Sequence, residues 1–139
     1  MNKELGNIFF HLLRQLLQEH TALWQKELPN LTKQQYAVLC AVYARPGIEQ
    51  IELMDAALST KATLAELLVR MENKEYVVRE EGENDKRRRF ITLTAKGEQV
   101  LKSAQPLADK VDAYFLEKLP NAEQITLVDM LKGLLRKDL

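Results

Sequence analysis

The chain has 139 residues, the length of one ordinary domain, and 46% of them are hydrophobic, which is enough to form a core. Its 20 basic and 20 acidic side chains cancel, so the net charge points to no class of partner, although a local basic patch can still bind nucleic acid. A single cysteine, Cys40, excludes an internal disulfide framework. No segment has the composition of a signal peptide or the length of a membrane span, so we expect a cytoplasmic protein.

The first predicted element is a long amphipathic helix from about Lys3 to Glu27. Its apolar residues, from Leu5 to Trp24, recur at steps of three and four. Pro29 follows its end, where a proline commonly stops a helix.

Three further helices are expected in the middle of the chain. The first starts after Thr32, which can form a capping box with Gln35, and it ends at the sequence RPG. A shorter helix covers about 50–58, and a third begins with Ser59 as its N-cap. The buried face of the third helix has the spacing i, i+3, i+4, i+7 and consists of Leu64, Leu67, Leu68 and Met71. Its opposite face is small or polar.

Two segments rich in β-branched residues, about 76–80 and 88–94, flank the turn-forming sequence EGEND and predict a β-hairpin. Four consecutive basic residues lie at the start of the second segment: Lys86, Arg87, Arg88 and Arg89. Four acidic residues in the same hairpin match their charge: Glu80, Glu81, Glu83 and Asp85. The hairpin can therefore present a positively charged face only if the fold separates the basic side chains from the acidic ones.

Two helices are expected after the hairpin. The first spans about 95–119, with an apolar stripe over 100–115, and Pro106 inside it should kink or locally break it. Asn121 is expected to cap the last helix, whose apolar residues fall within 125–135. The end helices carry more apolar surface than one small lobe can cover, which predicts a homodimer.

Helix, helix, helix and a two-stranded hairpin follow one another in the order of a winged helix-turn-helix. In such a lobe the third helix enters the major groove, and the hairpin, or wing, reaches phosphates or a minor groove. We expect Val77, Ile91 and Leu93 to anchor the wing on the core. The predicted fold class is mainly α (α+β), a winged helix-turn-helix lobe with a two-stranded wing plus a helical dimerisation region. A run of four basic residues is often only a solvated surface, and the alternative function is a helical adaptor that binds proteins rather than DNA.

Three segments resemble the MarR family of bacterial transcriptional regulators. The sequence LTKQQYAVLCAVYARPGI resembles the family's approach to the helix-turn-helix, and LSTKATLAELLVRMENKEYVVRE resembles its recognition helix and first wing strand. The sequence NDKRRRFITLTAKGEQVL resembles the family signature. Together, STKATLAELLVRMEN and DKRRRF look closest to a HosA-like subgroup of the family.

The resemblance implies a homodimeric repressor that binds a pseudo-palindromic operator in double-stranded DNA and is released by a small aromatic acid or phenol. It implies one domain over 1–139. Residues about 1–30 and 97–139 would form the helical dimerisation region, and about 31–96 the DNA-binding lobe.

By position, the resemblance also implies the residues that contact DNA. The recognition helix would contribute Ser59, Thr60, Lys61, Thr63, Glu66 and Arg70, and the wing would contribute its four basic residues. Asp85 and Arg87 would form a salt bridge that aims the arginine toward the minor groove. Glu66 departs from the basic residue often found there, and Glu75 stands where a glycine often ends the recognition helix.

Candidate ligand-binding residues lie on the first two helices and are His11, Arg14, His20, Trp24 and Tyr36. Cationic or donor groups would meet a carboxylate, and aromatic rings would stack on the ligand. Each also has a structural reading, since the histidines can be surface residues and Trp24 a core or dimer contact.

The remaining chemistry is sparse. No cysteine or carboxylate accompanies the histidines at ligand spacing, so neither a metal site nor a cofactor is expected. Ser59 and Ser103 have no histidine and aspartate arrangement of a hydrolase, so we expect no catalytic residue and no enzyme. Cys40 lies among apolar residues and is expected to be a buried, inert thiol.

Overall fold

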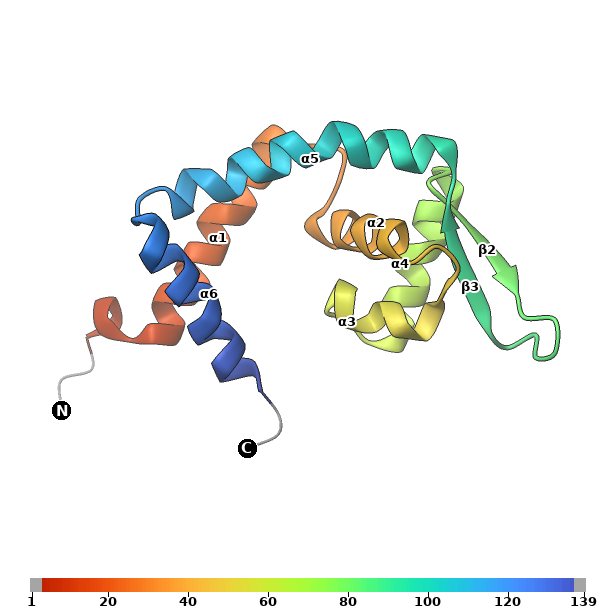
Figure 1. The fold of residues 1–139 in the computed structure, drawn as a ribbon, viewed down its shortest axis with the longest axis horizontal. Helices are drawn as coiled ribbons and strands as arrows, with labels where there is room; N and C mark the ends of the chain where they lie inside the picture. Colours follow the sequence, from red (N-terminus) through yellow and green to blue (C-terminus); the bar gives the residue numbers. More distant parts are fainter. Residues whose placement is uncertain (1–3, 137–139) are drawn as a thin grey trace.

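The computed structural model describes residues 4–136, and Lys3, the expected start of the first helix, lies outside this range. Figure 1 shows a lobe of short helices with a small sheet at one end, joined by one long helix to two helices at the other end. In chain order the elements are η1 (Leu5–Asn7), α1 (Phe9–Glu27), α2 (Lys33–Ala44), β1 (Ile48–Glu49), η2 (Gln50–Glu52), α3 (Leu53–Ala57), α4 (Lys61–Asn73), β2 (Val77–Glu81), β3 (Arg89–Leu93), α5 (Ala95–Leu116) and α6 (Asn121–Leu135). The predicted mainly helical winged fold is confirmed.

Side-chain caps mark where three of the helices begin: Thr32 caps α2, Thr60 caps α4 and Thr94 caps α5. The predicted capping box of α2 is present, because Thr32 Oγ1 accepts from the Gln35 amide and the Gln35 side chain accepts from the Thr32 amide, both at 3.0 Å. The cap of α4 is Thr60 rather than Ser59, since Thr60 Oγ1 accepts from the Thr63 amide at 3.3 Å. The recognition helix therefore starts one residue later than the sequence predicted.

The predicted cap at Asn121 was wrong, and of the two outcomes expected at Pro106, a kink or a local break, the break does not occur. Asn121 is the first residue of α6, after Pro120, and no side chain caps this helix. Pro106 does not break α5, which continues through it for 22 residues. Proline lacks the amide that would bond to the preceding turn, and its ring crowds the carbonyl there, but the buried Ala104 and Ala108 on either side pack α5 against the rest of the chain.

The sheet is antiparallel, in the order β1-β3-β2. The hairpin register pairs Val77 with Leu93 at its base and Glu81 with Arg89 near its tip. The strand β1, which pairs Ile48 with Ile91, was not predicted, because two residues are too few to display an alternating pattern. It places the segment before α3 directly beside the wing.

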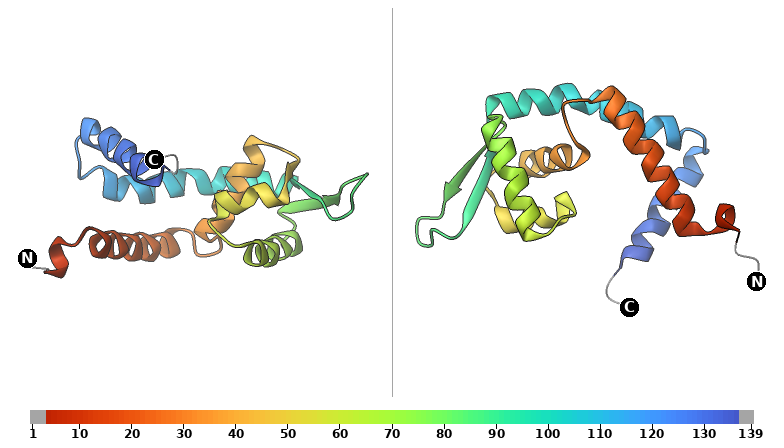
Figure 2. Two further views of the ribbon diagram at one scale, coloured as in Figure 1. Left: turned by 90° about the horizontal axis from the view of Figure 1, so that it is seen from below. Right: turned by 180° about the vertical axis from the view of Figure 1, so that it is seen from behind.

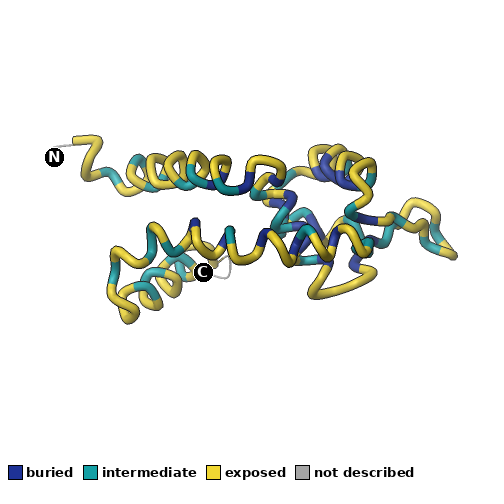
Figure 3. The backbone as a smooth tube through the Cα atoms, turned by 90° about the horizontal axis from the view of Figure 1, so that it is seen from above, coloured by how far each residue is buried: buried dark blue, intermediate teal, exposed yellow. Residues whose placement is uncertain are grey.

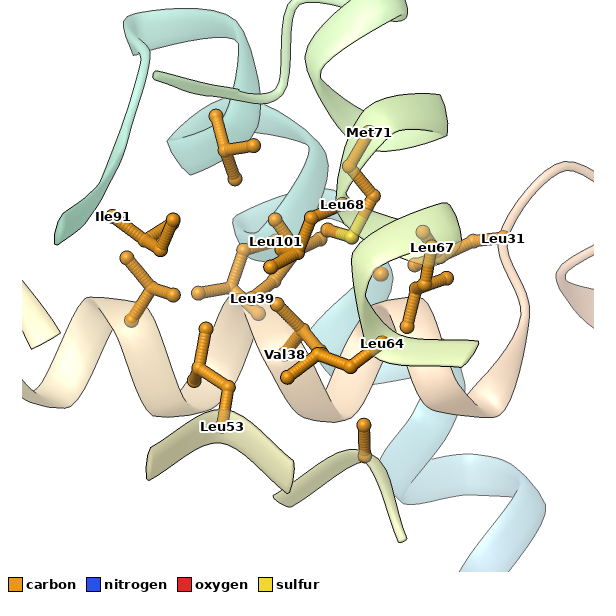
Figure 4. Close-up of a cluster of buried hydrophobic side chains, with 14 of the residues drawn as sticks. Leu31, Val38, Leu39, Leu53, Leu64, Leu67, Leu68, Met71, Ile91 and Leu101 are labelled. Carbon is orange, nitrogen blue, oxygen red and sulfur yellow. The ribbon is translucent and has the colours of Figure 1, made fainter. Parts of the chain in front are cut away.

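The core fills the space between α2, α3, α4 and the base of the wing. In Figure 4, Leu39 of α2, three residues of α4 and Ile91 of β3 point toward one another; the α4 residues are Leu64, Leu68 and Met71. All five have an exposure of 1% or less. The predicted apolar face of α4 is therefore confirmed, and its buried contacts hold the opposite face toward solvent.

The region expected to form the dimer divides into a part covered by the rest of the chain and an uncovered part. The stripe of α5 contains Leu101, Ala104, Ala108 and Val111, all buried within the chain, so much of the surface expected at a dimer interface is core. In contrast, α6 has no buried residue. Figures 2 and 3 show α6 lying apart from the lobe, with mostly exposed residues along it and along the start of α1. The exposed large apolar residues of these two helices are Phe9, Phe10, Leu12, Leu16, Leu17, Ile125, Val128, Met130, Leu134 and Leu135.

Candidate nucleic-acid interface

The free face of α4 carries the polar residues that the sequence singled out. Lys61, Thr63, Glu66 and Arg70 are all exposed, while Leu64 and Leu68 on the other side are buried. At about 100° per residue, Thr63, Glu66 and Arg70 lie within about 60° of one another around the helix, whereas Lys61 lies about half a turn from Arg70, at the other edge of the buried face. The arrangement offers a hydroxyl, a carboxylate and a guanidinium on one face and an ammonium at its first turn.

The hydroxyl groups at the start of α4 are partly occupied by the helix itself. Ser59 Oγ donates to the Thr60 carbonyl at 3.3 Å, and Thr60 Oγ1 donates to Thr63 Oγ1 at 3.0 Å. Thr63 keeps its own hydroxyl hydrogen for another acceptor. Lys61 and Thr63 are therefore better placed than Ser59 and Thr60 to bind a partner.

The end of α4 shows what replaces the family's usual glycine. Glu75 adopts a left-handed conformation, with φ at +65°. The Tyr76 amide donates to the Met71 carbonyl and the Glu75 amide to the Glu72 carbonyl, both at 2.9 Å, which is the Schellman pattern. The turn keeps the geometry of a glycine cap although the residue is glutamate.

Arg87 lies at the tip of the wing and is turned toward solvent. Its Nε and Nη2 donate to the two oxygens of Asp85 at 3.1 and 3.2 Å, and its amide also donates to Asp85 at 2.9 Å. These hydrogen bonds hold the pKa of the Asp85 carboxyl below its ordinary value. The side chain of Arg87 remains 91% exposed, so a tethered but accessible guanidinium lies at this edge.

The two following arginines are paired with carboxylates on neighbouring strands. Arg88 contacts Glu49 of β1 at 2.9 Å, and Arg89 lies 3.8 Å from Glu81 of β2. Hydrogen bonds from Arg88 hold the pKa of Glu49 below its ordinary value, so the pair persists at neutral pH and is lost as the pH falls through that lowered value. Lys86 is exposed beside them. The four cations of the wing thus differ in how free they are.

Three of the five candidate ligand residues come together in one aromatic cluster. Trp24 lies between His20 and Tyr36, with ring centroids 6.2 and 5.4 Å apart, and the Trp24 indole donates to the Leu31 carbonyl at 2.7 Å. Burial raises the pKa of Tyr36 to about 12. This cluster ties the end of α1 to α2.

His20 also joins α1 to α5 through two residues that the sequence gave no reason to select. Its Nε2 lies 2.7 Å from Asp112 Oδ1, and its ring packs 5.6 Å from Phe115. The other ring nitrogen, Nδ1, is buried and has no hydrogen-bond partner within residues 4–136. Asp112 is 92 positions from His20 in the sequence, and only the packing of α5 on α1 brings Asp112 and Phe115 here.

The structure does not place the ligand candidates in one cavity. Trp24 lines a concavity of about 480 Å³ at the start of α2, where Lys33 and Lys74 are also found. Arg14 lines a separate, shallow concavity of about 460 Å³ on α1. His11 contributes to neither lining. A third concavity of about 520 Å³, lined by Tyr76 and Lys96, lies between the α1–α2 connection and α5.

Cys40 is exposed, and the expectation of a buried thiol was wrong. It lies on α2 one turn after Tyr36, on the side of the helix away from the buried Val38 and Leu39. Desolvation nevertheless raises the pKa of the Cys40 thiol. A thiol that stays protonated at neutral pH is a weak nucleophile.

The fold and these two exposed elements define a class of protein, the winged helix-turn-helix proteins that bind DNA. No helix in the described part of the chain combines the length and apolar character needed to cross a membrane.

Comparison with known proteins identifies the family. The profile of the MarR family matches residues 31–88. The transcriptional regulator HosA of Escherichia coli O157:H7 is 55% identical over 131 residues, which cover 94% of this chain and 97% of HosA. The HTH-type transcriptional repressor NicR of Pseudomonas putida is 28% identical over 92% of this chain and 82% of NicR. The solved structure of the PcaV transcriptional regulator from Streptomyces coelicolor, in complex with its natural ligand, has a TM-score of 0.86 at 26% identity, covering 96% of both chains.

The chain belongs to the MarR family. It is a DNA-binding transcriptional regulator and not an enzyme. The regulator interpretation is therefore confirmed over the adaptor alternative.

Proposed function

We propose that this protein is a cytoplasmic homodimeric repressor that binds a pseudo-palindromic operator and is released by a small aromatic acid or phenol. The exposed polar face of α4 carries the proposal, because the buried opposite face fixes Thr63, Glu66 and Arg70 toward a partner, and Lys61 is exposed at the first turn of the same helix. A helix of this width fits the major groove of B-form DNA.

Some of the proposed contacts bind the DNA backbone and position the protein, and others recognise base edges. Lys61 meets a phosphate, while Thr63 and Arg70 meet base edges. Glu66 repels phosphates but can accept from the amino group of a cytosine. Arg87 of the wing reaches the backbone or an adjacent minor groove, where Asp85 fixes its direction.

The homodimer is supported by the apolar surface that the protomer leaves uncovered. An isolated amphipathic helix with no buried residue is unusual in a stable protein, and α6 is such a helix in the protomer. A second copy that packs α6 and the start of α1 against their counterparts would bury these faces around a two-fold axis. We assign residues 1–30 and 97–139 to this region and 31–96 to the DNA-binding lobe, with the first half of α5 packed on the lobe.

The repressor role and the ligand are supported by two relatives. NicR is a transcriptional repressor, and PcaV was solved with its natural ligand. The concavity beside Trp24 offers an indole edge for an aromatic ring and the ammonium groups of Lys33 and Lys74 for a carboxylate. His20 and Tyr36, which lie behind this lining, hold the Trp24 ring in place.

A mobility-shift titration with the DNA upstream of the protein's own gene, repeated with a panel of benzoates and phenols, tests this proposal. An active ligand should weaken DNA binding by about 1–3 kcal/mol, the usual range of coupling between two sites. Lys33→Ala should lose the response to a carboxylate ligand while keeping its DNA affinity, and Lys26→Ala, which removes an exposed cation from the end of α1, is the matched control. Unchanged affinity across the whole panel at millimolar concentration would refute the ligand response.

A further inference from the structure

Arg88 is held by a two-pronged ion pair between segments far apart in the sequence. Its Nε and Nη2 donate to the two carboxylate oxygens of Glu49 at 3.0 and 2.9 Å, across 39 positions. The pairing of β1 with β3 places Glu49 opposite Phe90, and the Arg88 guanidinium carbon lies 5.1 Å from the centroid of that ring. The side chain of Arg88 therefore runs back over Phe90 to β1.

The neighbouring Arg87 is in a different state. Its side chain is 91% exposed, against 54% for Arg88 and 24% for the Glu49 carboxylate. Both arginines donate through Nε and Nη2 to a carboxylate, so they differ in where the pair holds the guanidinium rather than in how it is paired. Asp85 holds Arg87 at the tip with most of its side chain exposed, whereas Glu49 draws Arg88 back over Phe90 onto β1. Arg88 can therefore extend to a phosphate as Arg87 does only by leaving Glu49, which would then face the DNA as an unpaired negative charge.

Stability alone does not account for the pair. An ion pair at the surface contributes little to folding, and the backbone ladder already joins β1 to β3 at Ile48 and Ile91. A carboxylate among the wing cations weakens the attraction of this surface for DNA. The Glu49 carboxylate therefore affects DNA binding more than it affects folding.

We propose that Glu49 is a positioning residue that withholds Arg88 from DNA phosphates and so limits binding to random sequence. The inference rests on the proposed function, in which the wing meets DNA, and it revises the expectation that all four wing cations are contacts. Random DNA is bound almost wholly through phosphates. One withheld contact in each wing therefore weakens random binding, while operator binding keeps the base contacts of α4.

Salt-dependent binding of the full-length protein to a random duplex measures the withheld contact. Glu49→Gln should steepen the slope of log K against log salt by about 1.8 for a dimer with two wings, since each phosphate contact contributes about 0.9. Arg88→Ala alone should leave the slope unchanged. The double variant should return to the wild-type slope, and Glu49→Gln should also lower the ratio of operator to random affinity.

Two further variants make the result decisive. Glu52→Gln removes the same charge from a nearby carboxylate that pairs with Arg45 at 3.2 Å, and it should leave the slope unchanged. Arg87→Ala tests the proposed function by itself and should lower the slope by about 1.8. If Arg87→Ala lowers the slope but Glu49→Gln does not raise it, or if Arg88→Ala lowers it as much as Arg87→Ala, Glu49 does not withhold Arg88. If Arg87→Ala has no effect, the wing contact itself is refuted, and the inference with it.

Discussion

Leu134→Asp should convert the protein into a folded monomer. Leu134 lies on α6 and its exposure in the protomer is 68%, so the substitution removes no contact of the protomer's own core. In the proposed dimer the same side chain is buried against the second copy. The substitution therefore separates assembly from folding.

The size of the effect follows from that exposed fraction. Burial of a whole leucine side chain is worth about 2 kcal/mol, so covering the free part of Leu134 contributes about 1.4 kcal/mol. Two-fold symmetry counts the residue twice, which gives about 2.7 kcal/mol, or roughly a 100-fold weaker dimer. A carboxylate stranded in an apolar interface adds a further cost, so this value is a lower bound.

Sedimentation velocity over a dilution series gives the dimer dissociation constant, and circular dichroism reports whether the monomer keeps its helices. Val78→Asp is the matched control, because Val78 is an exposed aliphatic residue on β2 of the DNA-binding lobe, and it should stay dimeric. A Leu134→Asp variant that dimerises like the wild type would refute the reasoning. So would a monomer that binds operator DNA with wild-type affinity.

Three further predictions concern single turns. Asp85→Ala should weaken DNA binding in a mobility shift although it removes a negative charge, because it frees both the guanidinium and the amide of Arg87; unchanged or tighter binding would contradict this. Glu75→Gly should raise the free energy of unfolding by about 1 kcal/mol, which is the cost of a left-handed backbone at a residue with a side chain. A urea titration at fixed protein concentration that shows no gain in stability would contradict this strain. Gly97→Ala should lower the free energy of unfolding by about 3 kcal/mol, because its new Cβ would overlap the Tyr76 carbonyl oxygen. If the variant is as stable as the wild type, α5 can shift away from Tyr76.

The sequence was a good guide where a pattern repeats over many residues. The apolar face of α4 and the capping box of α2 were predicted correctly because periodicity and cap chemistry are local properties. The strand β1 and the cap at Thr60 were missed because each depends on one or two residues whose role is decided by contacts with distant segments. Pro106 in α5 shows the same limit, since packing on both sides of the proline outweighs its local preference.

The sequence predicted which residue types form the candidate site better than it predicted which residues they pair with. The sequence placed four cations in the wing, but it could not reveal that Arg88 faces Glu49, because the two are joined only when β1 pairs with β3. It likewise grouped His20 with Trp24 on one helix and could not add Asp112, which arrives through the packing of α5. Contacts between elements, rather than residue identity, decide which of these groups remain free.

The central claim is that two copies of the chain read one symmetric site through α4. Selection of binding sequences from a library of randomised duplexes, with wild-type protein and with Thr63→Ala, tests it most directly. The wild type should enrich a two-fold symmetric sequence whose half-sites lie about 10 base pairs apart, one turn of DNA, or a multiple of that distance. Thr63→Ala should relax the preference at one position in each half-site by about 1–3 kcal/mol. Enrichment of no sequence, or of an asymmetric one that Thr63→Ala leaves unchanged, would contradict the account.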